Sequence, residues 1–458
     1  MAERFEIVEK AVLTMLEEKK YPTLRDILIT MNPSDVAGLF DCLEEKQIPL
    51  MFRLLPKELA AETFVEMESD AQEMLIRGFS DTELKEVVDE LYVDDAVDII
   101  EEMPANVVGR ILRSADSQTR QQINNILKYP KDSAGSIMTT EYVDLKKSMT
   151  VADAIKRIRR TGVDKETIYT CYVTDSVRRL LGVVSAKALL LAEDDDVLED
   201  IMETNIIYVH TTDDQEEVAN QLTKYDFVAI PVVDGEKRLV GIVTFDDAMD
   251  ILEEETTEDI EKMAAITPSD KPYLRTGVVQ IFSKRIPWLL VLMVSATFTG
   301  MIISSFEESL AKFAVLTAFI PMLMDTGGNS GSQASVTIIR GLSLHEIEMR
   351  DIGRILWKES RVGLLTGATL AVVNFGKIML VDRMLLGNTS ITMAVAAVVC
   401  VTLVATVFLA KLVGCSLPIL AKRIGFDPAV MASPFITTIV DALSLFIYLQ
   451  VATAVLGL

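Results

Sequence analysis

The chain has 458 residues, of which 50% are hydrophobic, yet its net charge is −24. Residues 1–275 contain 31 Lys and Arg against 58 Asp and Glu, whereas residues 276–458 contain 13 against 10. Because an acidic surface repels phosphates, this excess argues against a nucleic-acid partner and favours a cation. A solvated acidic surface without any ligand is the simpler explanation.

The four cysteines form no CxxC pair, which is typical of reduced thiols. Residues 1–20 are charged and helical in pattern, so we expect no signal peptide there. The sequence has no phosphate-binding loop and no nucleophile elbow, and its two histidines are far apart. We therefore expect no enzymatic activity.

Residues 1–132 are predicted to form an acidic, α-helical superhelix, because apolar residues recur at helical spacing and a helix-pair pattern repeats weakly. Three aspartates in this region are candidate cation ligands: Asp94, Asp95 and Asp98. Asp94 and Asp98 are four residues apart and therefore share one helix face. Ordinary solvent-facing charge explains these acids equally well.

Residues 133–246 contain two similar segments, each with an early Met-bearing stretch and a closing strand. This pattern resembles a tandem pair of α/β CBS modules, the βαββα unit named from cystathionine β-synthase, which often binds adenine nucleotides. The resemblance implies a ribose-binding aspartate three residues after the closing Ser or Thr. That residue is Asp247 in the second module but Ala188 in the first. If ATP binds, the second module is therefore expected to hold it.

Residues 247–275 are predicted to form a connecting helix and a linker. Seven acids around its start are candidate metal ligands: Asp246, Asp247, Asp250, Glu254, Glu255, Glu258 and Asp259. Four of these recur at steps of three and four residues and would share one helix face: Asp247, Asp250, Glu254 and Glu258. Like charges at that spacing destabilise a helix, so we expect divalent cations to neutralise them.

Residues 276–458 are predicted to form an all-α domain of five membrane-spanning helices, because five apolar stretches reach the length of a bilayer. These stretches are Ile286–Ser305, Phe313–Ile339, Val362–Val381, Ile391–Ile419 and Ala429–Leu456. Basic residues concentrate before the first stretch and after the second and fourth. The N-terminus is therefore expected in the cytoplasm and the C-terminus outside.

Two of the predicted spans carry polar residues at membrane depth. The second contains Asp325, Asn329 and Gln333 among several glycines, a composition that favours a broken helix. A broken backbone at membrane depth is tolerated only where it lines a cavity or is buried in protein. The fifth contains Asp441, whose insertion costs about 2.5–3.5 kcal/mol. Lys377 and Lys411 are placed nearer the ends of their spans, so no basic residue is expected at the depth of Asp441. These features favour a cation path, although close helix packing and a protonated aspartate are the alternatives.

Three motifs in these spans and the preceding loop are specific: Gly327-Gly-Asn329, Asp427-Pro428, and Ser433-Pro434 followed by Thr437-Thr438 and Asp441. With the order of domains, they resemble the MgtE family of magnesium transporters. The resemblance implies a homodimer in the bilayer, a pore at the subunit interface and a connecting helix that plugs it. It makes Asp441 the ion-selecting residue, with Asp427, Asn329 and Thr437 as further metal-site candidates.

The chemistry agrees, because Mg²⁺ keeps several waters while one or two carboxylates bind it. Two Asp441 carboxylates and backbone carbonyls freed near Thr437 would hold a hydrated ion. We therefore expect passive Mg²⁺ import across a bacterial-type cell membrane, gated by intracellular Mg²⁺. A proton-coupled carrier of Mg²⁺, Co²⁺ or Mn²⁺ is the alternative, and a membrane-anchored nucleotide sensor without transport is a third class.

Overall fold

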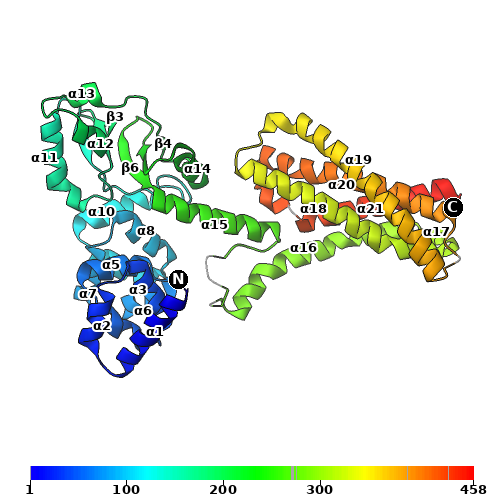
Figure 1. Cartoon of the computed structure of the whole chain (residues 1–458), viewed down its shortest axis with the longest axis horizontal. Coiled ribbons are helices and arrows are strands. Elements are labelled where there is room, and N and C mark those ends of the chain that lie inside the picture. Colours follow the sequence, from blue (N-terminus) through cyan, green and yellow to red (C-terminus); the bar gives the residue numbers. More distant parts are fainter. Residues whose placement is uncertain (1, 270–272, 275, 389, 432, 458) are drawn as a thin grey trace. The chain divides into compact units, whose positions relative to one another are not determined.

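The computed structural model describes residues 2–269, 273–274, 276–388, 390–431 and 433–457 (Figure 1). The chain divides into two compact units, Met1–Leu252 and Glu253–Leu458. Each unit is described by itself below.

The first unit begins with a series of short helices, as predicted. Proline in the first turn of α2, α3 and α4 starts these helices without losing a hydrogen bond, and Ser80 and Glu83 form a reciprocal cap on α7. The helices are α1 (Ala2–Glu17), α2 (Tyr21–Leu28), α3 (Pro33–Phe40), α4 (Ile48–Phe52), α5 (Lys57–Val65), α6 (Ser69–Gly78), α7 (Asp81–Val88), α8 (Val93–Glu102), α9 (Ala105–Ser114) and α10 (Ser117–Ile126).

Two βαββα modules follow, which confirms the predicted repeat. In each three-stranded sheet the first strand is parallel to the second and the second is antiparallel to the third. The first module contains β1 (Asp144–Lys146), α11 (Val151–Thr161), β2 (Thr170–Thr174), β3 (Leu180–Ser185) and α12 (Ala186–Leu191). After α13 (Leu198–Ile201), the second contains β4 (Val209–His210), α14 (Gln215–Tyr225), β5 (Ala229–Val233), β6 (Leu239–Thr244) and α15 (Phe245–Met263).

The two modules exchange their Met-bearing segments. A Cβ on Gly241 of β6 would lie 2.6 Å from Met138 Sδ, and a Cβ on Gly182 of β3 would lie 2.7 Å from Met202 Sδ. Each methionine therefore packs on the sheet of the other module, where only glycine leaves room for it. The modules form one interlocked pair.

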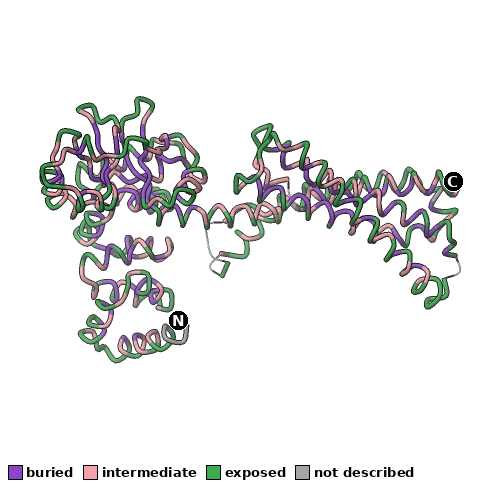
Figure 2. Tube along the Cα trace, turned by 45° about the horizontal axis from the view of Figure 1, so that its top comes forward, coloured by how far each residue is buried: buried purple, intermediate pink, exposed green. Residues whose placement is uncertain are grey.

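The helical region and the second module share one hydrophobic core. A single cluster of buried side chains extends from Val97 of α8 and Ile123 of α10 to Met138, Ile230 and Val243. Figure 2 shows buried residues along both the helices and the sheets of this unit. The helical region is therefore packed against the modules.

The connecting helix α15 begins at Phe245, two residues before the predicted boundary. It follows β6 directly and continues for 19 residues. The last helix of the second module and the connecting helix are thus one continuous element.

The second unit is all-helical after α15. Its elements are α16 (Val278–Ser305), α17 (Glu307–Lys312), η2 (Ala314–Phe319), α18 (Ile320–Ser343), η3 (Met349–Asp351), α19 (Ile352–Lys377), the π-helical η4 (Ile378–Leu385), α20 (Met393–Arg423), η5 (Pro428–Met431) and α21 (Ser433–Leu456). Among described residues, the segments containing α16, α19, α20 and α21 are long and apolar enough to span a membrane. The 24-residue α18 is not among them.

The predicted break in the second span is wrong, because α18 is continuous from Ile320 to Ser343. Its glycines serve close packing: a Cβ on Gly414 of α20 would lie 2.1 Å from the carbonyl oxygen of Gly331. The expectation of freed carbonyls near Thr437 is also wrong, since α21 is helical from Ser433 onward.

Candidate functional site

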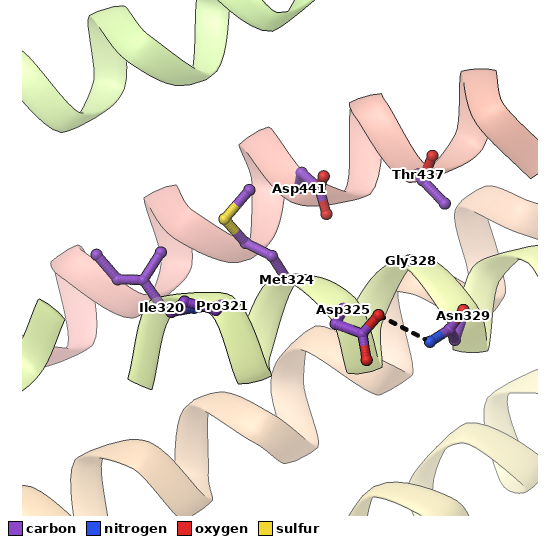
Figure 3. Close-up of a pocket in the computed structure, with 8 residues that line it drawn as sticks. All are labelled: Ile320, Pro321, Met324, Asp325, Gly328, Asn329, Thr437 and Asp441. Atoms are coloured by element: carbon purple, nitrogen blue, oxygen red, sulfur yellow. Dashed lines mark hydrogen bonds between the residues drawn. The ribbon is translucent and has the colours of Figure 1, made fainter. Parts of the chain in front are cut away.

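Polar side chains of α18 and α21 line an open pocket of about 460 Å³ in the second unit (Figure 3). Asp325 and Asn329 come from α18, and Thr437 and Asp441 come from α21. Asn329 Nδ2 donates a hydrogen bond to Asp325 Oδ1 at 3.1 Å. The pocket therefore joins two carboxylates and a neutral amide, which is a donor set suited to a hydrated divalent cation.

Close packing holds the two helices of this pocket in register. A Cβ on Gly328 would lie 3.0 Å from Thr437 Cγ2, and one on Gly327 would lie 2.8 Å from Ser444 Oγ. Thr437 Oγ1 donates to the carbonyl of Pro434 at 2.9 Å, so its side-chain proton is used within α21. The glycines therefore bring Asp325 and Asp441 to opposite walls of one pocket.

A second acidic group lies where the end of α15 meets the loop before η5. Lys262 Nζ is 2.7 Å from Asp427 Oδ2 and 2.6 Å from Glu258 Oε1. Ser343 Oγ donates to Asp259 Oδ2 at 3.1 Å, and Met263 packs against Ala429. Lys262 thus lies among three of the residues predicted as metal ligands, Glu258, Asp259 and Asp427.

The charge of Lys262 is secured by these neighbours. Burial acts to lower its pKa, but the bonds to Asp427 and Glu258 outweigh this effect and raise the pKa to about 12. Asp427 also accepts a hydrogen bond from the backbone nitrogen of Ala429 at 2.8 Å. Ammonium and carboxylates therefore form a stable group without a metal ion.

A third acidic group lies inside the first unit, between α8, the first module and the start of α15. Asp94 is 6% exposed, and its Oδ1 has no hydrogen-bond partner. Glu166, which precedes β2, also has a buried oxygen without a partner. The charged groups that most affect Asp94 are all carboxylates, namely those of Asp247, Asp95, Glu166 and Glu141. We call these five residues the acid cluster.

The acid cluster is strained electrostatically. Burial raises the pKa of Asp94 well above its usual range, and the neighbouring Asp247 raises it further. Burial together with Asp247 raises the pKa of Asp95 to about 7 and that of Glu166 to about 8. Burial raises the pKa of Asp247 to about 6, although a bond from Thr244 opposes this. Such shifts mark a functional site when no base offsets the charges.

The acid cluster is not a preformed metal centre. In the described part of the chain, no group of three or more His, Cys, Asp and Glu side chains is close enough to hold a metal ion. Carboxylates are nevertheless the ligands that Mg²⁺ prefers. A cation there would have to draw the side chains together.

Asp247, which was predicted to contact a nucleotide, lies beside Thr244 at the start of α15. Thr244 Oγ1 donates a hydrogen bond to Asp247, so the pair that the CBS resemblance implies lies at the start of α15. In the first module Ser185 Oγ instead accepts from the backbone nitrogen of Ala188. Asp247 therefore belongs to both the nucleotide motif and the acid cluster.

The predicted site residues thus fall into three groups. Asp94, Asp95 and Asp247 come together in the first unit, and the exposed Asp246 lies beside them. Asp98 and Asp250 are exposed as well. Glu258, Asp259 and Asp427 meet in the second unit, and the half-buried Glu255 and exposed Glu254 precede them on α15. Asn329, Thr437 and Asp441 line the pocket.

Three residues of these groups were not predicted from the sequence: Glu141, Glu166 and Lys262. Glu141 and Glu166 lie in loops of the first module, and no spacing rule connects them with α8. For Lys262, its position four residues after Glu258 was a usable signal of pairing. Lys411 was wrongly placed near a helix end: it lies inside α20 and is 6% exposed.

Three family models match the chain. Residues 320–451 match the MgtE divalent cation transporter domain, and residues 31–132 match the MgtE intracellular N domain. Residues 134–195 and 198–254 each match the CBS domain. The matches reproduce the predicted order of helical region, module pair and membrane region.

Similar proteins support the same assignment. The chain is 38% identical to "Magnesium transporter MgtE" of Thermus thermophilus, covering 96% of this chain and 97% of that protein. It is 32% identical to the protein of the same name from Bacillus subtilis, covering 97% and 96%.

A solved structure, the cytosolic domain of the Mg²⁺ channel MgtE in complex with ATP, matches with a TM-score of 0.51 and 36% identity. The match covers 53% of this chain and 99% of the chain in the solved structure. Domain order and near full-length similarity agree, and the chain belongs to the MgtE family of divalent cation transporters.

Proposed function

We propose that this protein conducts Mg²⁺ across a cell membrane, through the pocket lined by Asp325, Asn329 and Asp441. The observation that carries the proposal is the meeting of two carboxylates, from α18 and α21, in one open pocket of about 460 Å³. Intramembrane carboxylates are costly and mark ion paths. The names of the full-length relatives support Mg²⁺ as the ion.

The open side of the pocket supports a homodimer. Asn329 and Gln333 are exposed on α18, and they also line a second open pocket of about 650 Å³. A second copy would close the polar face and bring a second Asp441 to the ion. Basic loops support a cytoplasmic N-terminus and an outside C-terminus.

The acid cluster is the proposed sensor of intracellular Mg²⁺. Its carboxylates repel one another, at roughly 1 kcal/mol for two charges about 4 Å apart in water and several times more where they are partly buried. Mg²⁺ binding would reverse that repulsion and hold α8 against the start of α15. Because a ligand shifts the population toward the state it binds better, rising Mg²⁺ stabilises the closed unit.

The end of α15 is the proposed gate. Three residues at the end of α15 make contacts with the rest of the second unit: Met263 with Ala429, Lys262 with Asp427, and Asp259 with Ser343. The end of α15 therefore lies against the loop before α21 and against the C-terminal end of α18, the two helices proposed to line the pore. Since α15 also carries Asp246 and Asp247 of the sensor region, the sensor and the gate belong to one continuous helix in the sequence. A full cell would thereby close its own uptake path.

ATP is a proposed second ligand of the module pair. The observation that favours it is the Thr244–Asp247 pair, whose carboxylate could accept bonds from ribose hydroxyls. Mg²⁺ and ATP would compete or cooperate at Asp247, so ATP binding must be titrated at fixed free Mg²⁺. Absence of binding heat would remove ATP from the proposal.

Flux into proteoliposomes of purified protein tests the transport proposal. Mg²⁺, Mn²⁺ and Co²⁺ are compared, each with and without a pH gradient. We expect Mg²⁺ flux that does not depend on the pH gradient. Flux that follows the gradient would instead establish a proton-coupled carrier, and no flux of any ion would leave a membrane-anchored sensor.

A further inference from the structure

Lys411 is a charged residue in the interior of α20, away from either helix end. It lies 12 residues before Arg423, the last residue of the helix, which corresponds to about 18 Å along the axis. Its side chain is buried, with 6% of the residue exposed. A lysine at such depth costs about 2.5–3.5 kcal/mol and by default indicates function.

The ammonium of Lys411 has no direct ion pair among the described residues, although the half-buried Glu359 of α19 lies near enough that both charges act on the Cys415 thiol. Nζ donates to the carbonyl oxygen of Ser330 at 3.4 Å, which is long for a charge-assisted hydrogen bond. Within the described residues, no carboxylate oxygen lies within 4.0 Å of this nitrogen. Ser330 Oγ beside it is also buried and has no partner. The one direct partner of this ammonium in the described part of the chain is therefore a backbone carbonyl, which compensates a buried charge only in part.

The location of Lys411 relates it to the ion path. Ser330, whose carbonyl accepts from Lys411, directly follows the pocket residue Asn329. About one turn after Lys411, the backbone of α20 contacts that of α18 at Gly414 and Gly331. The other face of α18 presents Asn329 and Gln333 to the two open pockets. The ammonium is therefore separated from the polar face by about one helix diameter, ~10 Å.

We propose that the fixed positive charge of Lys411, behind α18, weakens the binding of divalent cations in the pore and so sets both affinity and release. This inference rests on the proposed transport function. An ion path must bind its ion strongly enough to admit it and weakly enough to release it. Asp325 and Asp441 supply the attraction, and Lys411 supplies an opposing charge that water does not screen.

Coulomb's law gives the minimum size of the effect. A unit charge and a divalent ion about 10 Å apart change a binding constant roughly fourfold even with the dielectric constant of water. A lower effective dielectric constant inside the bundle increases the factor. Removing the charge should therefore lower the half-saturating Mg²⁺ concentration at least about fourfold.

The test measures Mg²⁺ flux against Mg²⁺ concentration for Lys411→Met, Lys411→Gln and Lys411→Arg in proteoliposomes. The two neutral variants are expected to lower both the half-saturating concentration and the maximal flux, because the ion binds more tightly and leaves more slowly. Lys411→Arg keeps the charge and should stay within about twofold of wild type.

Lys422 provides a matched control on the same helix. Its Nζ also donates to a carbonyl of α18, that of Leu342, at 3.4 Å, but at the end of α20. Lys422→Met should leave the half-saturating concentration unchanged. Thermal unfolding of each variant separates a folding defect from a pore effect.

Two results would overturn the inference. One is an unchanged half-saturating concentration in a folded neutral variant, and the other is the same shift in Lys411→Arg as in Lys411→Met, which would indicate packing instead of charge. Wild-type protein without any Mg²⁺ flux would contradict the proposed transport function itself, so the two failures are distinguishable.

Discussion

The carboxylates of the first unit and those of the second unit are compensated differently. In the acid cluster, buried oxygens of Asp94 and Glu166 have no hydrogen-bond partner, and the dominant neighbours of Asp94 are other acids. In the second unit, Asp427 pairs with Lys262 and Asp325 accepts from Asn329. The carboxylates of the first unit therefore lack a compensating base, and a proton or a cation would relieve their repulsion, whereas Asp427 and Asp325 of the second unit already have partners.

This difference separates sensing from conduction and gating. A sensor responds to Mg²⁺ only if its closed form is unfavourable in the absence of the ion. A gate contact or a pore must instead persist while ions come and go. The four predictions below test this contrast, beginning with the largest expected effect.

Asp441→Ala should reduce Mg²⁺ flux at least about a hundredfold, because the pocket then loses a carboxylate that attracts the ion. Proteoliposome flux measures the loss, and size-exclusion chromatography verifies the oligomeric state. Asn329→Ala should have a weaker effect, since a neutral amide orients water without supplying charge. Flux at the wild-type level in Asp441→Ala would show that the pocket is not the ion path.

Asp94→Asn should raise, by about tenfold, the Mg²⁺ concentration that protects the first unit from protease. The amide resembles the protonated carboxyl, so the Mg²⁺-free protein should differ little from wild type near neutral pH. Asp98→Asn is the matched control, because Asp98 is exposed on the same helix. Equal effects of both substitutions would show that general surface charge, and not the acid cluster, binds the ion.

Some of this organisation could be predicted from the sequence. Helical periodicity, the repeated βαββα pattern and the apolar stretches are properties of residues close together in the sequence. The structure confirms the first two and four of the five apolar stretches, because α18 is not among the described helices that are long and apolar enough to span a membrane. Asp441 was recognisable because a charge inside an apolar stretch is conspicuous by itself. The acid cluster was only half predicted, since Glu141 and Glu166 join Asp94 through tertiary packing. The continuity of α18 was mispredicted because its glycines allow close packing against α20 and α21. Such tertiary contacts leave no pattern among neighbouring residues of the sequence.

Protons should compete with Mg²⁺ in the acid cluster. The folded-state pKa values of Asp95, Glu166 and Asp247, about 7, 8 and 6, lie above those of the unfolded chain. Without Mg²⁺, these groups stabilise the folded unit below about pH 4, and that stability is lost as the pH rises through 6 to 8.

The protective Mg²⁺ concentration should therefore rise as the pH falls. One group with a pKa of about 7 gives a change of roughly tenfold between pH 8 and pH 6. Protease protection of the full-length protein at the two pH values measures this change. Equal Mg²⁺ requirements at both values would contradict proton competition.

Lys262→Met should release the end of α15 from Asp427 in the absence of Mg²⁺. The Lys262 and Asp427 side chains are 22% and 34% exposed, so solvent screening limits the pair to about 1 kcal/mol, or roughly a fivefold change in the docked population. The loss also leaves Glu258 and Asp427 facing each other without a base, which adds repulsion to the lost attraction.

The maleimide labelling rate of a cysteine at position 263 measures this release in Mg²⁺-free buffer, because Met263 packs against Ala429 when the helix is docked. Lys262→Met and Asp427→Asn should raise the rate by similar factors, while Lys262→Arg should not. If the gate contact instead requires Mg²⁺ as the acid cluster does, the wild-type rate without Mg²⁺ will already equal that of Lys262→Met. That outcome would remove the contrast between the two units, since both would then depend on an external cation.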